Sequence, residues 1–459
     1  MRPIRWLIVA SLLTGAAPVP GRADTPSDLA RAYVAAHSLS WEAIAHRGVP
    51  SFARQTGLAC SACHYQFLQL NPFGRKFKLN GYTLTAQQLI TEKEPANGGA
   101  LALSPIPLVS AMLTTSVTHI SGATAGVQND AAMLPQELSV FLAGQISSKV
   151  GIFSQFTYGG ADGAFGMDNL DVRYANKSQV GGSTEMVYGL TLNNNPTIQD
   201  LWNTTPGWGF PFTGSEGAPG SAAATVLDGA LSGNVLGLGG YTMVGNTVYG
   251  ELSVYRSALQ GFAAPEDGTG AIKGVAPYWR FSLQKEWDTR YLMVGTYGLH
   301  VSEFPDVVSG PTNTFTDIGV DAQFETPVGA GNFVARGTWL HEKQKLDATF
   351  AAGGSDNTEN TLKTLRMNGS YYPKQWVGLT AGYFQTTGTS DATLYGTLTG
   401  DPKTTGFIGE VDFNPWENVR LGLQYTGYGK FDGGSTNYDG AGRDASDNNT
   451  LFLFGWLVF

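Results

Sequence analysis

Most of the chain after residue 107 alternates between apolar and polar positions with a period of two residues. In 419–426, Val, Leu, Leu and Tyr alternate with Arg, Gly, Gln and Thr, and the stretches 317–325 and 248–255 repeat the pattern. A β-strand with one apolar and one polar face produces this alternation. The segments are about ten residues long, the length of a strand in a membrane barrel. A soluble β-sandwich would show the same alternation, so the period alone leaves both architectures open.

The lengths of the connectors decide between the two. We count sixteen strand-like segments after residue 107, the second beginning near Gln136 and the fourth near Asp168. Seven short turns alternate strictly with eight long loops, as in a barrel with short periplasmic turns and long external loops. An even strand count places both termini on the periplasmic side. We therefore predict an outer-membrane antiparallel β-barrel, porin-like and mainly β, over residues 105–459, with fourteen or eighteen strands as neighbouring counts. The expected long loops lie near 120–135, 160–167, 195–233, 258–273, 303–314, 343–360, 388–403 and 430–447.

Two segments give this barrel further detail. Residues 451–459 are rich in aromatic side chains and end in Phe459. A last strand that pairs with the first leaves no exposed edge in lipid, and a C-terminal Phe resembles the assembly signal of outer-membrane proteins. The longest loop, 196–233, contains Trp202 and Trp208, and the third loop of porins folds into the lumen. Its tail of Gly, Ser and Ala is equally typical of an external loop, so both positions stay open.

The same alternation assigns charged residues to the lumen. Nine acids against five arginines give a modestly acidic interior, which is weak evidence for a metal path because mixed charge lines most water-filled barrels. The predicted lumenal acids are Glu137, Asp171, Glu185, Glu251, Asp317, Asp321, Glu325, Glu410 and Asp412, and the arginines are Arg173, Arg280, Arg336, Arg366 and Arg420.

Ahead of the barrel lies the motif Cys60-Ser-Ala-Cys63-His64. Cys-x-x-Cys-His is the spacing at which haem c is attached through two thioethers, and the adjacent His is the axial ligand of the iron. A disulfide needs no following His, and a zinc ribbon needs a second Cys pair, whereas these are the chain's two cysteines. We predict one covalently bound haem c.

The beginning of the chain supports that prediction. Basic residues at 1–5, an apolar run over 6–17 and small residues before position 24 are typical of a secretory signal peptide, assigned to 1–23. Haem c is attached outside the cytoplasm, so an exported chain is expected. Residues 24–104 are predicted to form a small, largely helical haem segment, with one helix over 29–46 that ends before Pro50.

For the sixth haem ligand and for the partners of the haem propionates, the sequence offers several candidates. Met112 lies at a lumenal position near the periplasmic end of the first strand, and His46 is the local alternative that would give a bis-His haem. His37 is weaker, and His119 is expected on the outer face. Propionates could pair with basic side chains; an ordinary solvated basic face is an equal alternative. The candidates are Arg54, Arg75, Lys76 and Lys78.

Three stretches between residues 49 and 82 carry a resemblance. The first is Val49-Pro-Ser-Phe-Ala-Arg-Gln-Thr-Gly57, the second is the Cys-x-x-Cys-His motif, and the third is Pro72-Phe-Gly-Arg-Lys-Phe-Lys-Leu-Asn-Gly-Tyr82. Together they resemble the fused monohaem cytochrome–porin family, the outer-membrane iron-oxidising cytochromes of iron-oxidising bacteria. Looser similarity continues in 134–139, 168–175 and 200–208. The resemblance implies an N-terminal haem segment followed by a porin-like barrel.

Composition narrows the function classes. The net charge of −9 argues against a nucleic-acid partner, and the sequence contains no stretch of 18 apolar residues after the signal. No Ser-His-Asp set, HExxH motif or phosphate loop appears, so no hydrolase or transferase site is expected. The leading interpretation is an outer-membrane electron-transfer protein, with oxidoreductase-type activity. It would carry electrons from extracellular Fe(II) through the haem to a periplasmic c-type cytochrome or another soluble carrier. The alternatives are a diffusion porin with a haem-bearing plug and an outward conduit to an external acceptor.

Overall fold

The computed structural model describes residues 50–85, 87–91, 102–122, 124, 126–229, 231–257 and 270–459. The chain divides into two units, 1–45 and 46–459, and the first lies wholly outside these ranges. The predicted signal peptide, the helix over 29–46, His37 and His46 therefore fall outside the described residues. Among the described residues, no helix has the length and apolar character needed to cross a membrane.

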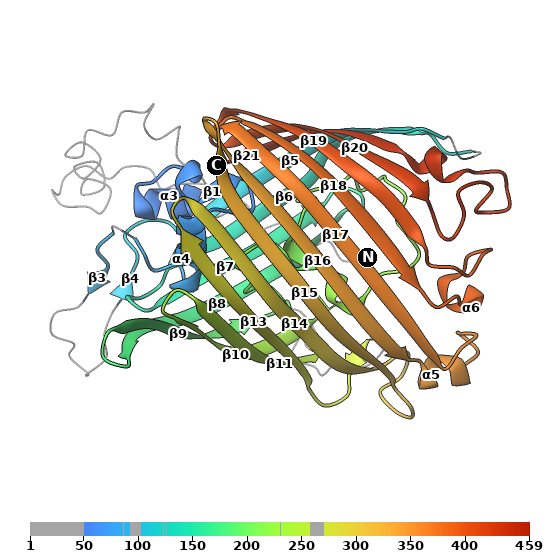
Figure 1. The fold of residues 1–459 in the computed structure, drawn as a ribbon, viewed down its shortest axis with the longest axis horizontal. Coiled ribbons are helices and arrows are strands. Elements are labelled where there is room, and N and C mark those ends of the chain that lie inside the picture. The colour runs from blue at the N-terminus through green and yellow to red at the C-terminus, as the bar shows by residue number, and fades with distance from the viewer. Residues whose placement is uncertain are drawn as a thin grey trace, which may run out of the picture. The chain divides into compact units, whose positions relative to one another are not determined.

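Sixteen long antiparallel strands close into a barrel, as the alternation predicted (Figure 1). Each strand pairs with its neighbour in sequence, and the last strand pairs with the first, from Thr450 opposite Ile120 to Val458 opposite Met112. The short β12 (Ala271–Ile272) adds a pairing to β14. The long strands are β5 (Val109–Ile120), β6 (Asp130–Gln145), β7 (Val150–Gly159), β8 (Ala164–Val180), β9 (Thr184–Asn193), β10 (Val235–Val244), β11 (Val248–Ser257), β13 (Ala276–Trp287), β14 (Arg290–Phe304), β15 (Asn313–Val328), β16 (Gly331–Lys345), β17 (Glu359–Lys374), β18 (Val377–Gly388), β19 (Thr404–Trp416), β20 (Val419–Lys430) and β21 (Thr450–Val458).

The two faces of the strands differ as a membrane barrel requires. On β20, Leu421 and Leu423 are 44% and 45% exposed on the outer face, whereas Arg420 and Gln424 on either side of them are buried in the interior. Apolar side chains thus face outward and polar side chains face the lumen. Both the beginning of β5 and the end of β21 lie at the end of the barrel that carries the short turns, and the small helices α5 (Asp347–Ala351) and α6 (Ala392–Tyr395) lie at the other (Figure 1).

Two strands are longer than predicted. β6 begins at Asp130 instead of near Gln136, and β8 begins at Ala164, which shortens the expected loop 160–167 to four residues. In both strands a bulge interrupts the alternation: Thr114 and Ser116 of β5 face Glu137 and Met133, and the register of β8 shifts where Gln155 faces Asn169 and Phe156 faces Met167. In β8 one extra residue, Asp168, separates the two pairings and moves the preceding side chains to the opposite parity, whereas in β6 residues 134–136 interrupt the alternation and the parity is the same on both sides. The period of two is therefore interrupted at the bulge, although the strand continues on both sides of it.

The segment before the barrel lies inside the barrel, at the end with the short turns (Figure 1). It comprises α3 (Pro50–Thr56), the 3₁₀ turn η2 (Cys60–Ala62), a hairpin of β1 (His64–Gln66) and β2 (Gln69–Leu70), and α4 (Pro72–Leu79). A further short pair joins β3 (Ile90–Thr91) to β4 (Ala102–Leu103). We call residues 50–85 the plug. Arg75 of α4 bonds Glu325 on the barrel wall, and Tyr241 donates a hydrogen bond to the carbonyl of Leu79 (2.9 Å).

The third long loop, between β9 and β10, folds into the lumen. It contains two 3₁₀ turns, η3 (Pro206–Trp208) and η4 (Val226–Asp228), and its Leu201 and Trp202 are fully buried. The Trp202 Nε1–H donates to the hydroxyl of Tyr291 on β14 (2.5 Å). The plug and this loop together fill much of the barrel interior.

Candidate functional site

The Cys-x-x-Cys-His turn is fixed to the plug by Asn71, the residue before α4. Its Nδ2 donates to the carbonyls of Ser61 (3.1 Å) and Ala62 (3.0 Å), and its Oδ1 accepts from the backbone N–H of Gly74 (3.0 Å). The backbone N–H of Asn71 also donates to the carbonyl of Cys63 (2.9 Å). One side chain therefore caps the helix and closes the turn. Asn followed by Pro is a start signal for a helix, which makes this cap readable from the sequence.

Gly74 allows α4 to lie directly against the motif. A Cβ atom at this position would lie 2.1 Å from the carbonyl oxygen of Cys63, so any side chain would collide with the backbone of the turn. Neither Asn71 nor Gly74 stands out by periodicity. The sequence pattern Asn-Pro-Phe-Gly directly after the motif is the signal that identifies both.

A cavity of about 420 Å³ separates the motif from the barrel wall. Cys60, Cys63 and His64 line one side, and aromatic and aliphatic side chains from β5, β6, β7 and β21 line the other. Residues 207–212 of the third loop contribute a further part of its lining. Its size and largely apolar lining fit the usual properties of a cofactor pocket, which encloses about 300–1,000 Å³. The wall residues are Met112, Phe141, Phe153, Trp456 and Val458.

The three residues of the motif have the chemistry that haem c attachment needs. Both cysteines are half-buried and neither forms a disulfide in the described chain, and the Cys60 Sγ donates to the carbonyl of Glu417 (2.8 Å). Burial lowers the pKa of His64 to about 4, with a smaller opposing effect from a hydrogen bond to the backbone of Gln69. The imidazole is therefore neutral at physiological pH, the form in which a ring nitrogen can ligate a metal.

Met112 lines the same cavity as His64. It is 8% exposed and packs with Phe67, Phe141 and Trp456. The prediction that Met112 faces the lumen is confirmed, and its role as a ligand stays a prediction. His119 lies at the other end of β5, is exposed, and contacts Asp130 on β6 (Nδ1 to Oδ1, 2.7 Å). His119 is thus remote from the cavity in the topology, as predicted.

The basic residues near the motif occupy different places. Arg75 forms two bonds to Glu325 (2.6 and 3.1 Å) and lies over the ring of Tyr291, and Arg54 donates to the carbonyl of Val109 (2.5 Å). Lys76 is exposed and lines a separate pocket of about 380 Å³. Among these four candidates, Lys78 is the one that lines the cavity.

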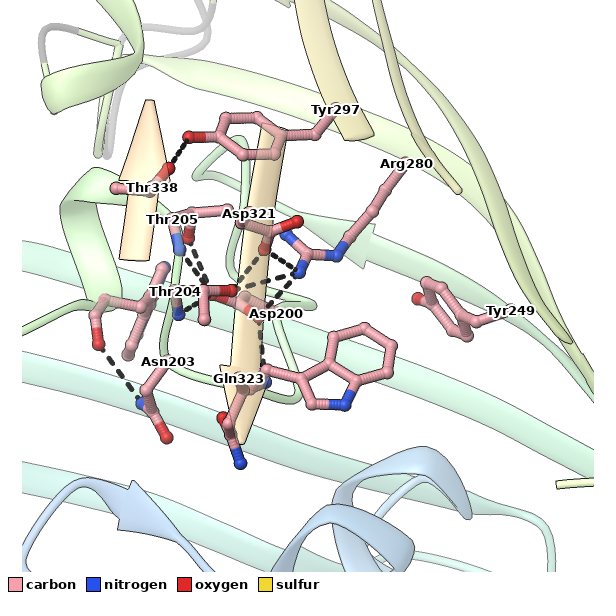
Figure 2. A network of polar contacts seen from close by, with 12 residues as sticks. Asp200, Asn203, Thr204, Thr205, Tyr249, Arg280, Tyr297, Asp321, Gln323 and Thr338 are labelled. Atoms are coloured by element: carbon pink, nitrogen blue, oxygen red, sulfur yellow. Dashed lines mark hydrogen bonds and ion pairs between the residues drawn. The ribbon is translucent and has the colours of Figure 1, made fainter. Parts of the chain in front are cut away.

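The interior further along the barrel is built from ion pairs (Figure 2). Asp200 of the third loop accepts hydrogen bonds from the backbone N–H groups of Trp202, Thr204 and Thr205. Arg280 of β13 bonds Asp321 of β15 (2.5 Å) and lies 3.5 Å from Asp200. The guanidinium also lies over the ring of Trp202, 4.8 Å from its centroid. This network fixes the third loop to the wall.

Most of the acids and arginines that the alternation assigned to the lumen are buried there. Arg173 pairs with Asp171 (2.6 Å), and Arg420 pairs with Glu410 (2.7 Å) and Asp412 (2.6 Å). Glu185 is exposed, and pairs with Lys177 (3.4 Å). The sequence predicted which face these residues occupy but not that most of them form closed pairs, since the pairing depends on neighbouring strands and on the third loop.

Comparison with solved structures returns porins at low identity. The chain is similar to an anion-selective porin from Comamonas acidovorans (12% identity, TM-score 0.45, covering 76% of this chain and 98% of the porin). It is also similar to OmpF of Salmonella typhi in complex with daunomycin (11%, 0.45, 76% and 97%) and to a loop-deleted OmpT of Vibrio cholerae (11%, 0.44, 76% and 98%). No family model and no curated protein matches the chain. The fold assignment rests on the strand pairings of the chain itself.

Proposed function

We propose that this chain is an outer-membrane electron-transfer protein of the fused monohaem cytochrome–porin type. It takes electrons from extracellular Fe(II) and delivers them to a periplasmic c-type cytochrome or another soluble carrier, by way of one haem c attached to the plug. The observation that carries this proposal is the cavity that Cys60, Cys63 and His64 share with Met112, inside a closed barrel.

The residues of the cavity fit haem c. The half-buried thiols of Cys60 and Cys63 provide the two sulfur atoms for the thioethers, and the neutral imidazole of His64 provides a nitrogen ligand. The thioether of Met112 provides a candidate sixth ligand from the barrel wall. The largely apolar lining lowers the local dielectric around the site, which tunes a redox centre. A bound haem c supplies the one-electron iron couple that the proposed activity requires.

The outer membrane is the proposed location because of the barrel's surface. Apolar side chains such as Leu421, Leu423 and Leu453 lie exposed on its outer face, and buried ion pairs fill its interior. Lipid contact would cover the outer face, and a closed barrel satisfies every backbone group within the membrane. With the short turns on the periplasmic side, the plug and its cavity lie at the periplasmic end.

The diffusion-porin alternative needs an open aqueous path. In the described interior, Arg173, Arg280 and Arg420 are each at most 1% exposed, because the plug, the third loop and their acidic partners cover them. Charged side chains that line a water-filled channel would be solvated. The buried, paired interior therefore favours electron transfer over diffusion of solutes.

The test uses purified, detergent-solubilised protein under anaerobic conditions. Addition of Fe(II) should reduce the haem, which is measured as a change in its Soret and α absorption bands. Redox-inactive Mn(II) should leave the spectrum unchanged. A midpoint potential above that of the Fe(II) donor is expected, since inward transfer requires it. A haem that Fe(II) cannot reduce, in a protein with large single-channel conductance in planar bilayers, would contradict the proposal and support the porin.

A further inference from the structure

Lys78 is a half-buried cation at the wall of the cavity. It lies in the last turn of α4, and its side chain reaches the third loop, where Nζ donates to the backbone carbonyl of Asp200 (2.8 Å). The ammonium also lies over the ring of Trp208, 5.0 Å from its centroid. An ammonium has three N–H donors. The hydrogen bond to Asp200 uses one N–H group of Lys78, so two N–H groups can donate to another acceptor.

The acids around Lys78 already have other partners. In the described chain no carboxylate forms an ion pair with Nζ. Asp171 is bonded to Arg173 (2.6 Å) and to the hydroxyl of Tyr82 (2.7 Å). The carboxylate of Asp200 is turned toward its own loop and Arg280.

The remaining nearby acid, Glu251, accepts from the hydroxyls of Tyr249 (2.9 Å) and Ser253 (3.2 Å). Lys78 is therefore a cation without a direct anionic partner.

Two amide side chains on the cavity wall are occupied by the protein, whereas the Trp208 Nε1–H on the same wall has no hydrogen-bond partner among the residues that the structure describes. Asn203 accepts from the backbone N–H of Leu70 (2.9 Å) and donates to the carbonyl of Trp208 (3.2 Å). Asn169 donates to Gln155 (3.1 Å) and accepts from Asn195 (2.9 Å). Lys78 thus differs from these amides, because it carries unused donors and a full charge.

Partial burial of an ammonium without a counter-ion has a desolvation cost, and an anion placed beside it offsets that cost. Burial lowers the pKa of Lys78 to about 7, and the nearby Arg173 acts in the same direction, whereas Asp171, Asp200 and Glu251 oppose it. A carboxylate in the cavity would favour the charged form. An anionic group on a ligand in the cavity would therefore neutralise the charge of Lys78.

We propose that Lys78 binds a carboxylate of the haem propionates, so that the acidic edge of the macrocycle points inward to the third loop. This inference rests on the proposed function. It assigns the propionate contact to Lys78, whereas Arg75 is held by Glu325 and Lys76 lies in the separate pocket. Lys78 acts as a positioning residue that links the cofactor to the third loop through Asp200 and Trp208.

The test compares three variants of the full-length protein: Lys78→Gln, Lys78→Arg and, as matched control, Lys76→Gln. The readouts are covalent haem content, folding by heat-modifiable gel mobility, and the haem midpoint potential. Haem content should be equal in all three, because attachment depends on the cysteines. A nearby cation favours the reduced state, so Lys78→Gln should lower the equilibrium constant for reduction about tenfold, roughly 59 mV for one electron. Lys78→Arg and Lys76→Gln should leave the potential near that of the wild type.

A second measurement covers the case in which Lys78→Gln does not fold. The potential of the wild type should fall as the pH rises through the titration of Lys78, because the cation loses its proton, and Lys78→Arg should remove that slope. A folded Lys78→Gln with the wild-type potential, or an unchanged pH slope in Lys78→Arg, would overturn the assignment. Absence of haem from the wild type is a different outcome, which refutes the proposed function itself.

Discussion

The interior of this barrel has two regions that differ in whether their charged groups are paired. Around Asp200, Arg280 and Asp321, the third loop and the wall neutralise each other, and the hydrogen bonds of the loop's acid are nearly all internal (Figure 2). Around Cys60 and His64, the wall is largely apolar, and Lys78 on the cavity wall has no anionic partner among the described residues.

The difference indicates which region is structural and which binds a ligand. A closed network of ion pairs has no chemistry left for a substrate, and removing one member exposes the desolvation cost of the others. A cavity lined by candidate metal ligands and by a cation without an anionic partner can bind a ligand through both. The following substitutions test that division.

The largest effect is expected from Arg280→Ala, which leaves Asp321 and Asp200 buried without their cation. Breaking a buried pair in this way costs about 3–5 kcal/mol. Urea unfolding of the detergent-solubilised barrel should show that loss, and the freed third loop should raise single-channel conductance. Covalent haem content should remain at the wild-type value, since the cavity belongs to the other region. A stable variant would show that the network does not anchor the loop.

Gly74→Ala should be the next largest, because its Cβ would lie 2.1 Å from the carbonyl oxygen of Cys63. Overpacking of this kind costs about 1–3 kcal/mol, and here it displaces the turn that holds the motif. Altered haem absorption and a lower unfolding midpoint are expected. Gly166→Ala is the matched control, because no atom lies within 4 Å of a Cβ at that position. Equal effects of the two substitutions would contradict the packing argument.

Met112→Leu should change the spectrum more than the stability. The two side chains have similar volumes, so repacking should cost less than about 1.5 kcal/mol. If the thioether ligates iron, the variant loses sulfur-to-iron charge-transfer absorption and its midpoint potential falls. If its spectrum and potential equal those of the wild type while His46→Ala changes both, the haem is bis-His and Met112 only lines the cavity.

The smallest effect is expected from Lys177→Ala at the rim of the barrel. Lys177 pairs with Glu185 at 3.4 Å, and both side chains are about half exposed. Exposed pairs contribute about 0–1 kcal/mol because water and salt screen them. Urea unfolding should therefore barely differ from the wild type. A loss as large as that of Arg280→Ala would mean that burial does not distinguish the two kinds of pair.

The sequence predicted the barrel well because alternation along each strand directly reports which face is buried. The number of strands, the closure of Leu451–Val458 against the first strand, and the lumenal position of Met112 are all confirmed. The first residues of β6 and β8 were not predicted, because a bulge interrupts the alternation in each strand without ending the strand.

Contacts between distant segments could not be predicted in the same way. The infolding of the third loop depends on partners such as Arg280 and Tyr291, more than 70 residues away in sequence. The choice of Lys78 over Lys76 at the cavity depends on how α4 is rotated inside the barrel, which the wall determines. The Cys-x-x-Cys-His motif itself was local, and so its residues were identified before their surroundings.

The most direct test of the central claim is the covalent haem content of the folded barrel. Full-length protein, produced with the haem-attachment machinery of a bacterial periplasm, should give a c-type pyridine haemochrome equal to one haem per chain. The Cys60→Ala and Cys63→Ala variants should lose normal attachment while keeping heat-modifiable barrel mobility. A folded wild-type barrel that carries no haem, two haems per chain, or zinc in place of iron would contradict the account.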